Sequence, residues 1–354
     1  MMRYQYRQKR PISGLINGIR MNFLDDLDTV LARRLKEMGI QRKDTDDAIM
    51  DYCRFMRRII SVQPRRVYKA KEFSCPADYD KKLNYLETCI EKGEDLNPFL
   101  TRSVKKLSQE DSMLYDWNIY HFHLSDQLDN EKKDGFMVRS QYLLIAYVTS
   151  EAVYFIDVVS HNEMSQHLWT NYDYIQRIKD NWSDLLEKNL IKGVSLSEKV
   201  DEATLYKLRK AHISTFTELE DGSLYGLLGG GYASDGSSTD SVLQLQYLYR
   251  VVSALEELMS TQFWNLIGQA PEVVEQLKKN DNPCVHLIGT DGNRFILIEQ
   301  ELRIMFVVDF YNDTWRTSMA SFENSYMLFD DKKRMRFSYF LSKIREYNIK
   351  NVRN

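Results

Sequence analysis

The sequence is poor in cysteine and proline and lacks any long apolar run. Its 354 residues include only 4 Cys and 6 Pro, and no CxxC spacing occurs. Cysteines this few and this scattered favour a reducing compartment over a disulfide framework or a zinc knuckle. No stretch approaches the roughly 18–20 uninterrupted apolar residues of a membrane span, and no apolar run follows the basic start as in a secretory signal. We therefore expect a cytoplasmic protein with no membrane partner.

The residues that are abundant are ordinary for a globular protein. Hydrophobic residues make up 43% of the chain and charged residues 28%, which excludes a disordered or fibrous protein. Aromatic residues make up 12%, with 22 Tyr among them, enough to build a sizeable core. At roughly 100–200 residues per domain, this length allows two or three domains.

The net charge of −3 hides an asymmetry along the chain. Residues 1–72 carry 17 Lys and Arg against 9 Asp and Glu, whereas the remaining residues carry 31 against 42. A basic region with tyrosines nearby favours contact with the phosphates of RNA or another nucleic acid. The alternative is a solvated helix face that docks on the acidic remainder of the chain. The candidate nucleic-acid-binding residues are Arg57, Arg58, Arg65 and Arg66.

Hydrophobic periodicity predicts an α+β protein. Two β-branched and aromatic runs, 141–148 and 152–159, predict a hairpin of central strands covered by helices on one or both faces. A second hairpin and a third strand are expected over 284–310. The sequence predicts helices over 19–38, 45–60, 79–93, 163–182, 201–211, 240–267 and 331–347, and short strands over 66–73 and 213–219.

These elements and the charge distribution suggest three regions. Residues 1–72 form a basic helical region, and 73–195 form an antiparallel sheet module with flanking helices. Residues 196–354 form a second, smaller α+β module. Gly193 and its polar neighbours mark the second boundary.

Four of the 6 histidines fall between positions 121 and 167. His121 and His123 form an H-x-H pair, and on a strand they would share one face, because strand side chains alternate. His161 follows the second run of the predicted hairpin, at a strand end where catalytic groups are often presented. On a helix, His167 would point to roughly the opposite side, so His161 is the better third member.

This set suits metal-independent cleavage of RNA phosphodiesters. His121 and His123 would share the roles of base and acid, because imidazole titrates near neutrality. Arg139 is the candidate cation and would act with His161 on the charge that builds at phosphorus. No cofactor is expected for this chemistry.

Two alternatives use the same histidines. In a metal-dependent hydrolase, His121, His123 and His161 would be nitrogen ligands, with Asp157 or Asp116 as an oxygen ligand or orienting group. In a non-catalytic protein that binds nucleic acid or another protein, the histidines would satisfy a polar core.

Other motifs give weaker signals. The glycine-rich segment 226–241 could cradle a phosphate with its backbone N–H groups, or form a capped surface loop. It lacks both common nucleotide-binding glycine patterns. G-x-S-x-G and H-E-x-x-H are absent, and none of the cysteines lies in a recognisable nucleophile context.

The order of several motifs resembles a group of bacterial hypothetical proteins. These carry a D-W-x-I-x-H-x-H-L segment, a hydrophobic hairpin that ends in His, an Asn-Trp pair and a later glycine triplet. Here the motifs read DWNIYHFHL, QYLLIAYVTSEAVYFIDVVSH, NW at 181–182 and GGG. The resemblance covers about residues 60–240, with Tyr120 where the group has a further His, and it implies no activity.

A helix-plus-antiparallel-sheet module with scattered His and Arg is also similar, more distantly, to RelE-like and barnase-like ribonuclease toxins. That similarity is at the level of the fold. It implies a toxin or anti-phage effector with a protein inhibitor or antitoxin as partner.

Overall fold

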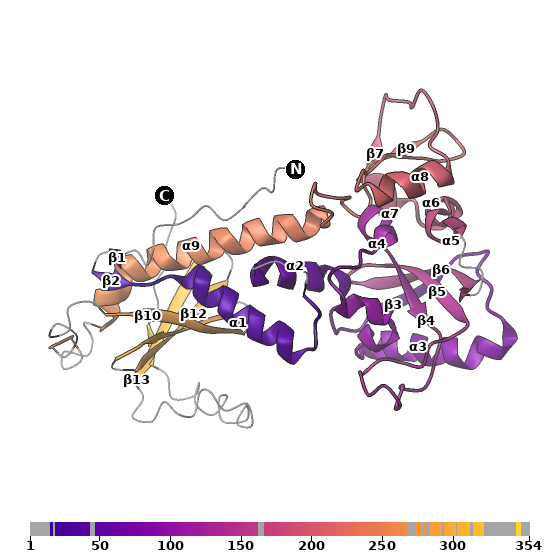
Figure 1. The fold of residues 1–354 in the computed structure, drawn as a ribbon. Coiled ribbons are helices and arrows are strands. Elements are labelled where there is room, and N and C mark those ends of the chain that lie inside the picture. The colour runs from indigo at the N-terminus through magenta and orange to yellow at the C-terminus, as the bar shows by residue number, and fades with distance from the viewer. Residues whose placement is uncertain are drawn as a thin grey trace. The chain divides into compact units, whose positions relative to one another are not determined.

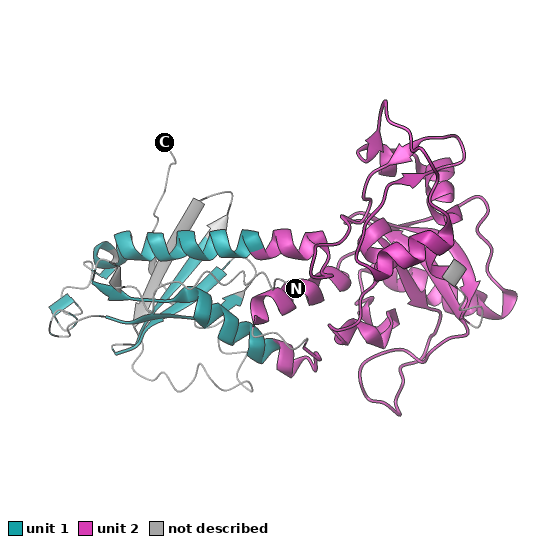
Figure 2. Cartoon of the chain, turned by 45° about the horizontal axis from the view of Figure 1, so that its top comes forward, with its two compact units in different colours: residues 1–34, 246–354 teal, residues 35–245 magenta. Residues whose placement is uncertain are grey.

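The structure is a computed structural model in which the chain forms two compact units (Figure 2). Unit 1 comprises residues 1–34 and 246–354, and unit 2 comprises residues 35–245. The structure describes residues 15–16, 18–42, 47–161, 166–267, 274–275, 277, 279, 283–291, 294–301, 303–311, 314–321 and 345–347.

Short runs of helices and runs of strands follow one another along the chain (Figure 1). The helices are α1 (Phe23–Glu37), α2 (Ala48–Arg58), α3 (Asp80–Lys92), α4 (Ser112–Trp117), α5 (Gln166–Thr170), α6 (Asp173–Trp182), α7 (Asp184–Glu187), α8 (Glu202–Lys210) and α9 (Thr239–Ile267), with 3-10 turns at Ala77–Tyr79, Asn97–Phe99 and Arg102–Lys105. The strands are β1 (Leu15–Ile16), β2 (Ile19–Arg20), β3 (Arg66–Lys69), β4 (Ile119–His123), β5 (Tyr142–Val148), β6 (Ala152–Ser160), β7 (Leu190–Ile191), β8 (Thr217–Glu218), β9 (Leu224–Tyr225), β10 (Val285–Asp291), β11 (Arg294–Glu299), β12 (Ile304–Tyr311), β13 (Thr314–Ser321) and β14 (Arg345–Tyr347).

The two units divide the chain at other places than the three predicted regions. Strand β3 lies before the expected boundary at residue 72, yet it pairs with β6 in one sheet. The expected boundary at residue 195 separates β7 from β9, which are also paired. Backbone pairing therefore joins segments that the charge distribution and composition had placed in different regions.

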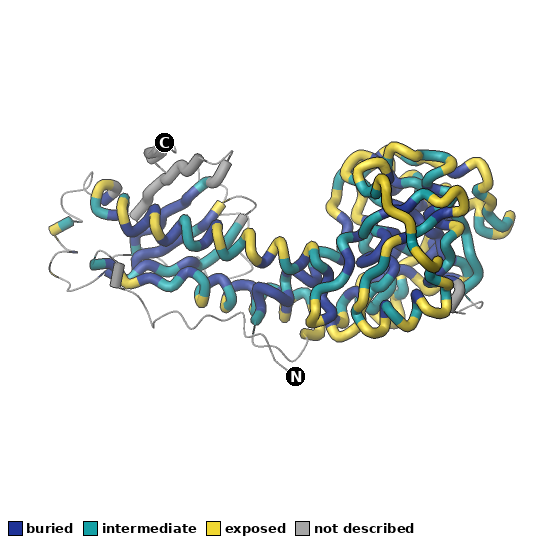
Figure 3. The backbone as a smooth tube through the Cα atoms, turned by 90° about the horizontal axis from the view of Figure 1, so that it is seen from above, coloured by how far each residue is buried: buried dark blue, intermediate teal, exposed yellow. Residues whose placement is uncertain are grey.

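Unit 2 is built on a four-stranded sheet with the order β3-β6-β5-β4. Strands β4, β5 and β6 are antiparallel, as the predicted hairpin requires, and β3 joins β6 in parallel. Most residues of β4 and β5 are buried, whereas β3 is largely exposed; Figure 3 colours the backbone by the burial of each residue. The hairpin prediction is therefore confirmed.

Helices cover both faces of this sheet. On one face Leu144 of β5 belongs to a core cluster with Leu86 of α3. On the other face the neighbouring Ile145 belongs to a cluster with Ile175 of α6. The apolar character of the whole strand follows, because successive side chains enter different helix layers.

Unit 1 contains a five-stranded antiparallel sheet with the order β10-β11-β12-β13-β14. Helix α9 packs on it through Phe263, whose ring centroid lies 5.7 Å from that of Phe306 on β12. The predicted strands over 284–310 are confirmed. The helix expected over 331–347 is wrong for Arg345–Tyr347, which pairs with β13, and 331–344 lie outside the described residues.

Both units combine helices with antiparallel sheet, which confirms the predicted α+β class. Across the described part of the chain, every helix is too short or too polar to cross a lipid bilayer.

Candidate functional site

The two histidines of the H-x-H pair lie on β4, which follows helix α4. Asp111 caps this helix by accepting a hydrogen bond from the Leu114 N–H at 3.1 Å. Asn118 ends the helix with a φ of 58°, a left-handed conformation that asparagine tolerates. On β4, His121 and His123 then line the same pocket, because alternate strand residues share a face.

The hairpin brings a third histidine to this pair. Strand β5 lies between β4 and β6, with Leu143 opposite both His123 and Val159. His161 follows β6 directly, and its ring stacks on that of His123, with centroids 5.7 Å apart and planes 17° apart. Two imidazoles that are 38 positions apart in the sequence are thus in contact.

Arg139 is a cation in contact with this stack. Its Nη2 donates to His161 Nε2 at 2.7 Å and lies 3.3 Å from Nδ1. A guanidinium only donates hydrogen bonds, so the His161 ring is the acceptor in this contact. The Arg139 side chain is exposed, whereas His123 is only 7% exposed.

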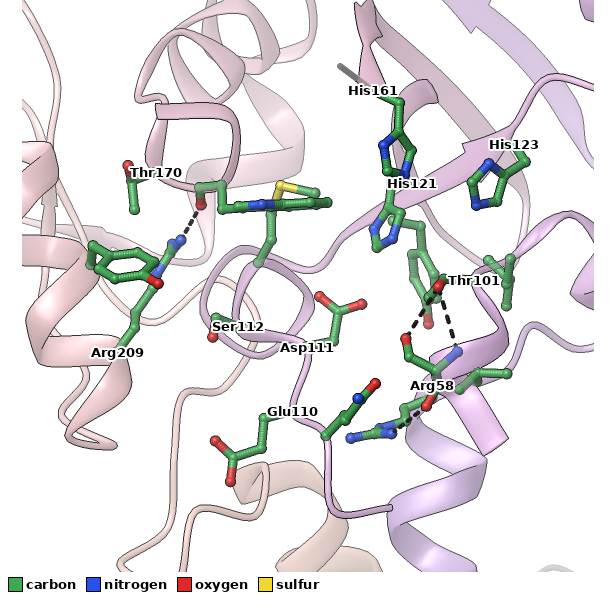
Figure 4. A pocket seen from close by; sticks show the side chains of 18 of the residues that line it. Arg58, Thr101, Glu110, Asp111, Ser112, His121, His123, His161, Thr170 and Arg209 are labelled. Atoms are coloured by element: carbon green, nitrogen blue, oxygen red, sulfur yellow. Dashed lines mark hydrogen bonds between the residues drawn. The ribbon is translucent and has the colours of Figure 1, made fainter. Parts of the chain in front are cut away.

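These residues line a pocket of about 410 Å³ within unit 2, which we call the histidine pocket. Its volume lies in the range of roughly 300–1,000 Å³ that is usual for small-ligand sites. Figure 4 shows the three imidazoles on one side of the pocket, Arg209 and Thr170 on the other, and Asp111 between them. The charged lining residues are Arg58, Arg139, Arg209, Lys210, Glu110 and Asp111.

His123 is held in its neutral form. Burial lowers the pKa of His123 to about 3, and the imidazoles of His121 and His161 act in the same direction, as does Arg139. Its Nδ1 faces the backbone N–H of Ser140 at 3.4 Å. The ring proton therefore lies on Nε2, which can donate a hydrogen bond.

His121 is neutral for a similar reason. Burial lowers the pKa of His121, Asp111 opposes this shift, and His161 adds to it. The ring lies edge-on to Trp169, with centroids 5.1 Å apart. Among the described residues its buried Nδ1 has no hydrogen-bond partner. Such an unsatisfied atom costs about 1–3 kcal/mol, so a polar ligand group or a water would stabilise it.

Sequence reasoning missed Arg209, the buried cation on the far side of the pocket. Its Nε donates to Asp116 at 2.7 Å, and its guanidinium lies 4.1 Å from the centre of the Trp117 ring. It also donates to the backbone oxygen of Trp169. An arginine near the end of an amphipathic helix looks like a surface residue in the sequence, so no signal there reveals this role.

In the metal-centre alternative, Asp157 or Asp116 would act as an oxygen ligand or orienting group, but both carboxylates form ion pairs with arginines. Asp116 pairs with Arg209, and Asp157 lies 2.8 Å from Arg177. Within the described ranges, no three His, Cys, Asp or Glu side chains converge as metal ligands would. The residues at the histidine pocket therefore do not fit the metal centre considered from the sequence.

Three of the four candidate nucleic-acid-binding arginines use their guanidinium groups inside unit 2. Arg57 pairs with Asp240 at 3.1 Å. Arg58 and Arg65 are buried and donate to backbone carbonyl oxygens. Arg66 on β3 is exposed. The four side chains therefore do not form one exposed phosphate-binding surface, which a count of charges could not reveal.

The glycine-rich segment 226–241 packs against the end of α4. The Gly229 N–H donates to the backbone oxygen of Asp116 at 2.7 Å, and the Gly231 N–H donates to the backbone oxygen of Tyr115 at 2.8 Å. A Cβ on Gly229 would lie 2.4 Å from the Tyr115 oxygen, so only glycine permits this approach. Because these two amides are engaged, they do not cradle a phosphate.

Comparison with known proteins gives no assignment. No protein-family model matches the chain, and no curated protein or solved structure is significantly similar to it.

Proposed function

We propose that unit 2 is a metal-independent endoribonuclease and that the histidine pocket is its active site. The observation that carries this proposal is the stack of His123 on His161, with Arg139 bound to the outer ring. Two imidazoles at this spacing can both reach one phosphate group. A guanidinium beside them suits the negative oxygens of that phosphate.

Cleavage would begin with attack of the RNA 2′-oxygen on the adjacent phosphorus. A base removes the 2′-hydroxyl proton, the O2′–P bond forms, and the bond from phosphorus to the 5′-oxygen breaks. An acid then protonates the leaving oxygen, which leaves a 2′,3′-cyclic phosphate and a 5′-hydroxyl. We assign base and acid to His121 and His123, and the phosphate contacts to His161 and Arg139.

The charge state of the histidine pocket fits this scheme once a substrate is bound. His121 and His161 both disfavour protonation of His123. A bound phosphate favours the imidazolium form, because an opposite charge lies within a few Å. One ring can then hold a proton while its neighbour stays neutral, which is the pair that acid–base catalysis needs.

The arginines of the pocket divide into two kinds. Arg58 donates to backbone oxygens and Arg209 pairs with the buried Asp116, so both stabilise the protein wall. Arg139 is exposed and donates to the ring of His161. A phosphate is a stronger acceptor than an imidazole nitrogen, so Arg139 is the cation that a substrate would recruit.

A non-catalytic pocket that binds a phosphate of nucleic acid is the second candidate. It is favoured by the pKa of His123, about 3, because a base this weak accepts a proton poorly from a hydroxyl group. In this case the neutral His123 would donate Nε2–H to a phosphate oxygen without exchanging a proton.

The two candidates are separated by a cleavage assay with a labelled single-stranded RNA in excess chelator, run beside a DNA of the same sequence. We expect cleavage of the RNA alone, with 2′,3′-cyclic phosphate ends. Arg139→Ala should lower the rate about a hundredfold. Lys81→Ala, which removes an exposed cation of α3 outside the pocket, should change it less than about twofold.

Each other outcome has a definite meaning. Cleavage that stops in chelator, or that attacks DNA equally, contradicts the proposed chemistry. Binding of intact RNA that is weakened by Arg139→Ala favours the non-catalytic pocket. The toxin or anti-phage role, its protein inhibitor and the cytoplasmic location stay predictions from the sequence.

A further inference from the structure

Unit 1 holds a thiol and a carboxylate in contact with one imidazole ring. Cys284 Sγ lies 3.3 Å from His286 Nε2. On the other side of the ring, His286 Nδ1 lies 3.1 Å from Asp26 Oδ1. The sulfur and the carboxylate thus contact opposite nitrogens of one imidazole.

Strand β10 and helix α1 build this arrangement. Cys284 directly precedes β10 and His286 lies two positions later, so the two side chains share a face. Asp26 lies in the first turn of α1, and its Oδ2 accepts the Leu287 N–H at 2.9 Å. The carboxylate is therefore fixed on β10 by both of its oxygens.

The protonation pattern follows from the donors and acceptors. An ionised carboxylate only accepts hydrogen bonds, so in its neutral form His286 carries its proton on Nδ1. Its Nε2 then presents a lone pair to the thiol, which is the tautomer that a general base needs.

Two simpler accounts leave part of this geometry unexplained. Docking of α1 on β10 explains why Asp26 contacts Leu287 and His286, but it gives no reason for the thiol on the opposite nitrogen. A metal site would need ligands that converge on one point, and no such group exists among the residues that the structure describes.

We propose that Cys284, His286 and Asp26 form a nucleophilic relay that accepts acyl groups from esters, thioesters or amides. The Cys284 thiol passes its proton to His286 Nε2 as the sulfur bonds to the carbonyl carbon. The bond from this carbon to the leaving oxygen, sulfur or nitrogen then breaks, and His286 gives the proton to the leaving group. Water hydrolyses the resulting thioester and restores the thiol. Asp26 is the positioning residue.

The surroundings of the sulfur suit a thiol that stays protonated until a neighbouring base removes its proton. Cys284 is partly exposed, as a reactive cysteine must be. Burial raises the pKa of its thiol. Arg20 lowers this pKa, while the carboxylates of Asp26, Glu299 and Glu301 raise it further. The resting group is therefore a thiol, and a neighbouring base is what makes it nucleophilic.

The chain contains a second cysteine that can serve as an internal reference for the reactivity of Cys284. Cys75 in unit 2 is also partly exposed, and burial also raises the pKa of its thiol. Its Sγ donates to the backbone oxygen of Pro76 and not to an imidazole. The alkylation rates of both cysteines by iodoacetamide at neutral pH can be measured by mass spectrometry in one sample of the full chain.

We expect Cys284 to react at least about tenfold faster than Cys75, and His286→Gln to remove this advantage while Cys75 is unaffected. Asp26→Asn should lower the Cys284 rate several-fold. Asp25→Asn, in the same helical turn but bound to Asn22, should not. Equal rates for the two cysteines in the unaltered chain, or a Cys284 rate that His286→Gln leaves unchanged, would overturn the relay.

Acyl transfer itself is tested with p-nitrophenyl acetate. A burst of one p-nitrophenolate per chain, with an acetyl group on Cys284 that Cys284→Ala abolishes, is the expected result. A burst that persists in Cys284→Ala, or the absence of any acetylated Cys284, would overturn the proposal. Since both tests concern unit 1, their failure leaves the ribonuclease proposal for unit 2 untouched.

Discussion

Each unit places a histidine among chemically active neighbours, and these neighbours differ in charge. In unit 2, His123 lies beside two imidazoles and a guanidinium, and its pKa is lowered to about 3. In unit 1, His286 lies between a carboxylate and a thiol. The first ring needs an incoming anion before it can hold a proton, whereas the second has a fixed negative partner. The surroundings, more than the residue type, decide which chemistry an imidazole can perform.

The strongest test of this difference removes one of the two rings. His123→Asn keeps a polar side chain but cannot exchange a proton, so we expect RNA cleavage to fall by about 10²–10⁴-fold. The alkylation rate of Cys284 should stay the same in the same preparation. Full cleavage by His123→Asn would exclude His123 from the proposed chemistry.

The next effect concerns the wall of the histidine pocket. Asp116→Asn leaves the buried Arg209 without its counter-charge, which should destabilise unit 2 by about 3–5 kcal/mol. The measurement is the urea midpoint of unit 2, obtained from the hydrogen exchange of peptides from residues 35–245 at increasing urea concentration. Asp221→Asn, which removes an exposed partner of Lys179, is the control and should leave the midpoint unchanged. Equal midpoints for Asp116→Asn and the control would show that the buried pair does not stabilise the unit.

A smaller effect should appear when the solution is made mildly acidic. The pKa of His123 is about 3 in the folded protein against 6.5 for an unperturbed ring, so the unfolded chain binds more protons between these pH values. The neutral ring contributes its full share to the free energy of unfolding above about pH 6.5. This contribution decreases as the pH falls, by at most about 1.4 kcal/mol per pH unit. His123→Leu should show a flatter pH dependence of the urea midpoint of unit 2. The same slope in both proteins would contradict the lowered pKa.

Local patterns predicted the elements well, and long-range pairing could not be predicted from them. The runs at 141–148 and 152–159 are apolar on both faces, and they form the central hairpin. The position of His161 after the second run also pointed toward the H-x-H pair. Composition gave no sign that β3 pairs with β6.

The candidate site in unit 1 shows the same contrast between local spacing and long-range contact. The two-residue spacing of Cys284 and His286 is visible in the sequence, although no cysteine was expected to act as a nucleophile. Nothing near these positions indicates that Asp26 lies opposite the ring. Contacts of this kind depend on how helices dock on sheets, which periodicity does not encode.

The interrupted course of unit 1 has a consequence for how the protein is made. Asp26 and His286 are 260 residues apart in the chain, and all of unit 2 is synthesised between them. At about 5–20 residues per second, the ribosome takes on the order of ten seconds to one minute to add this length. During that interval α1 has been synthesised without its partner strand, so the relay of Cys284, His286 and Asp26 is completed only after all of unit 2 has been made.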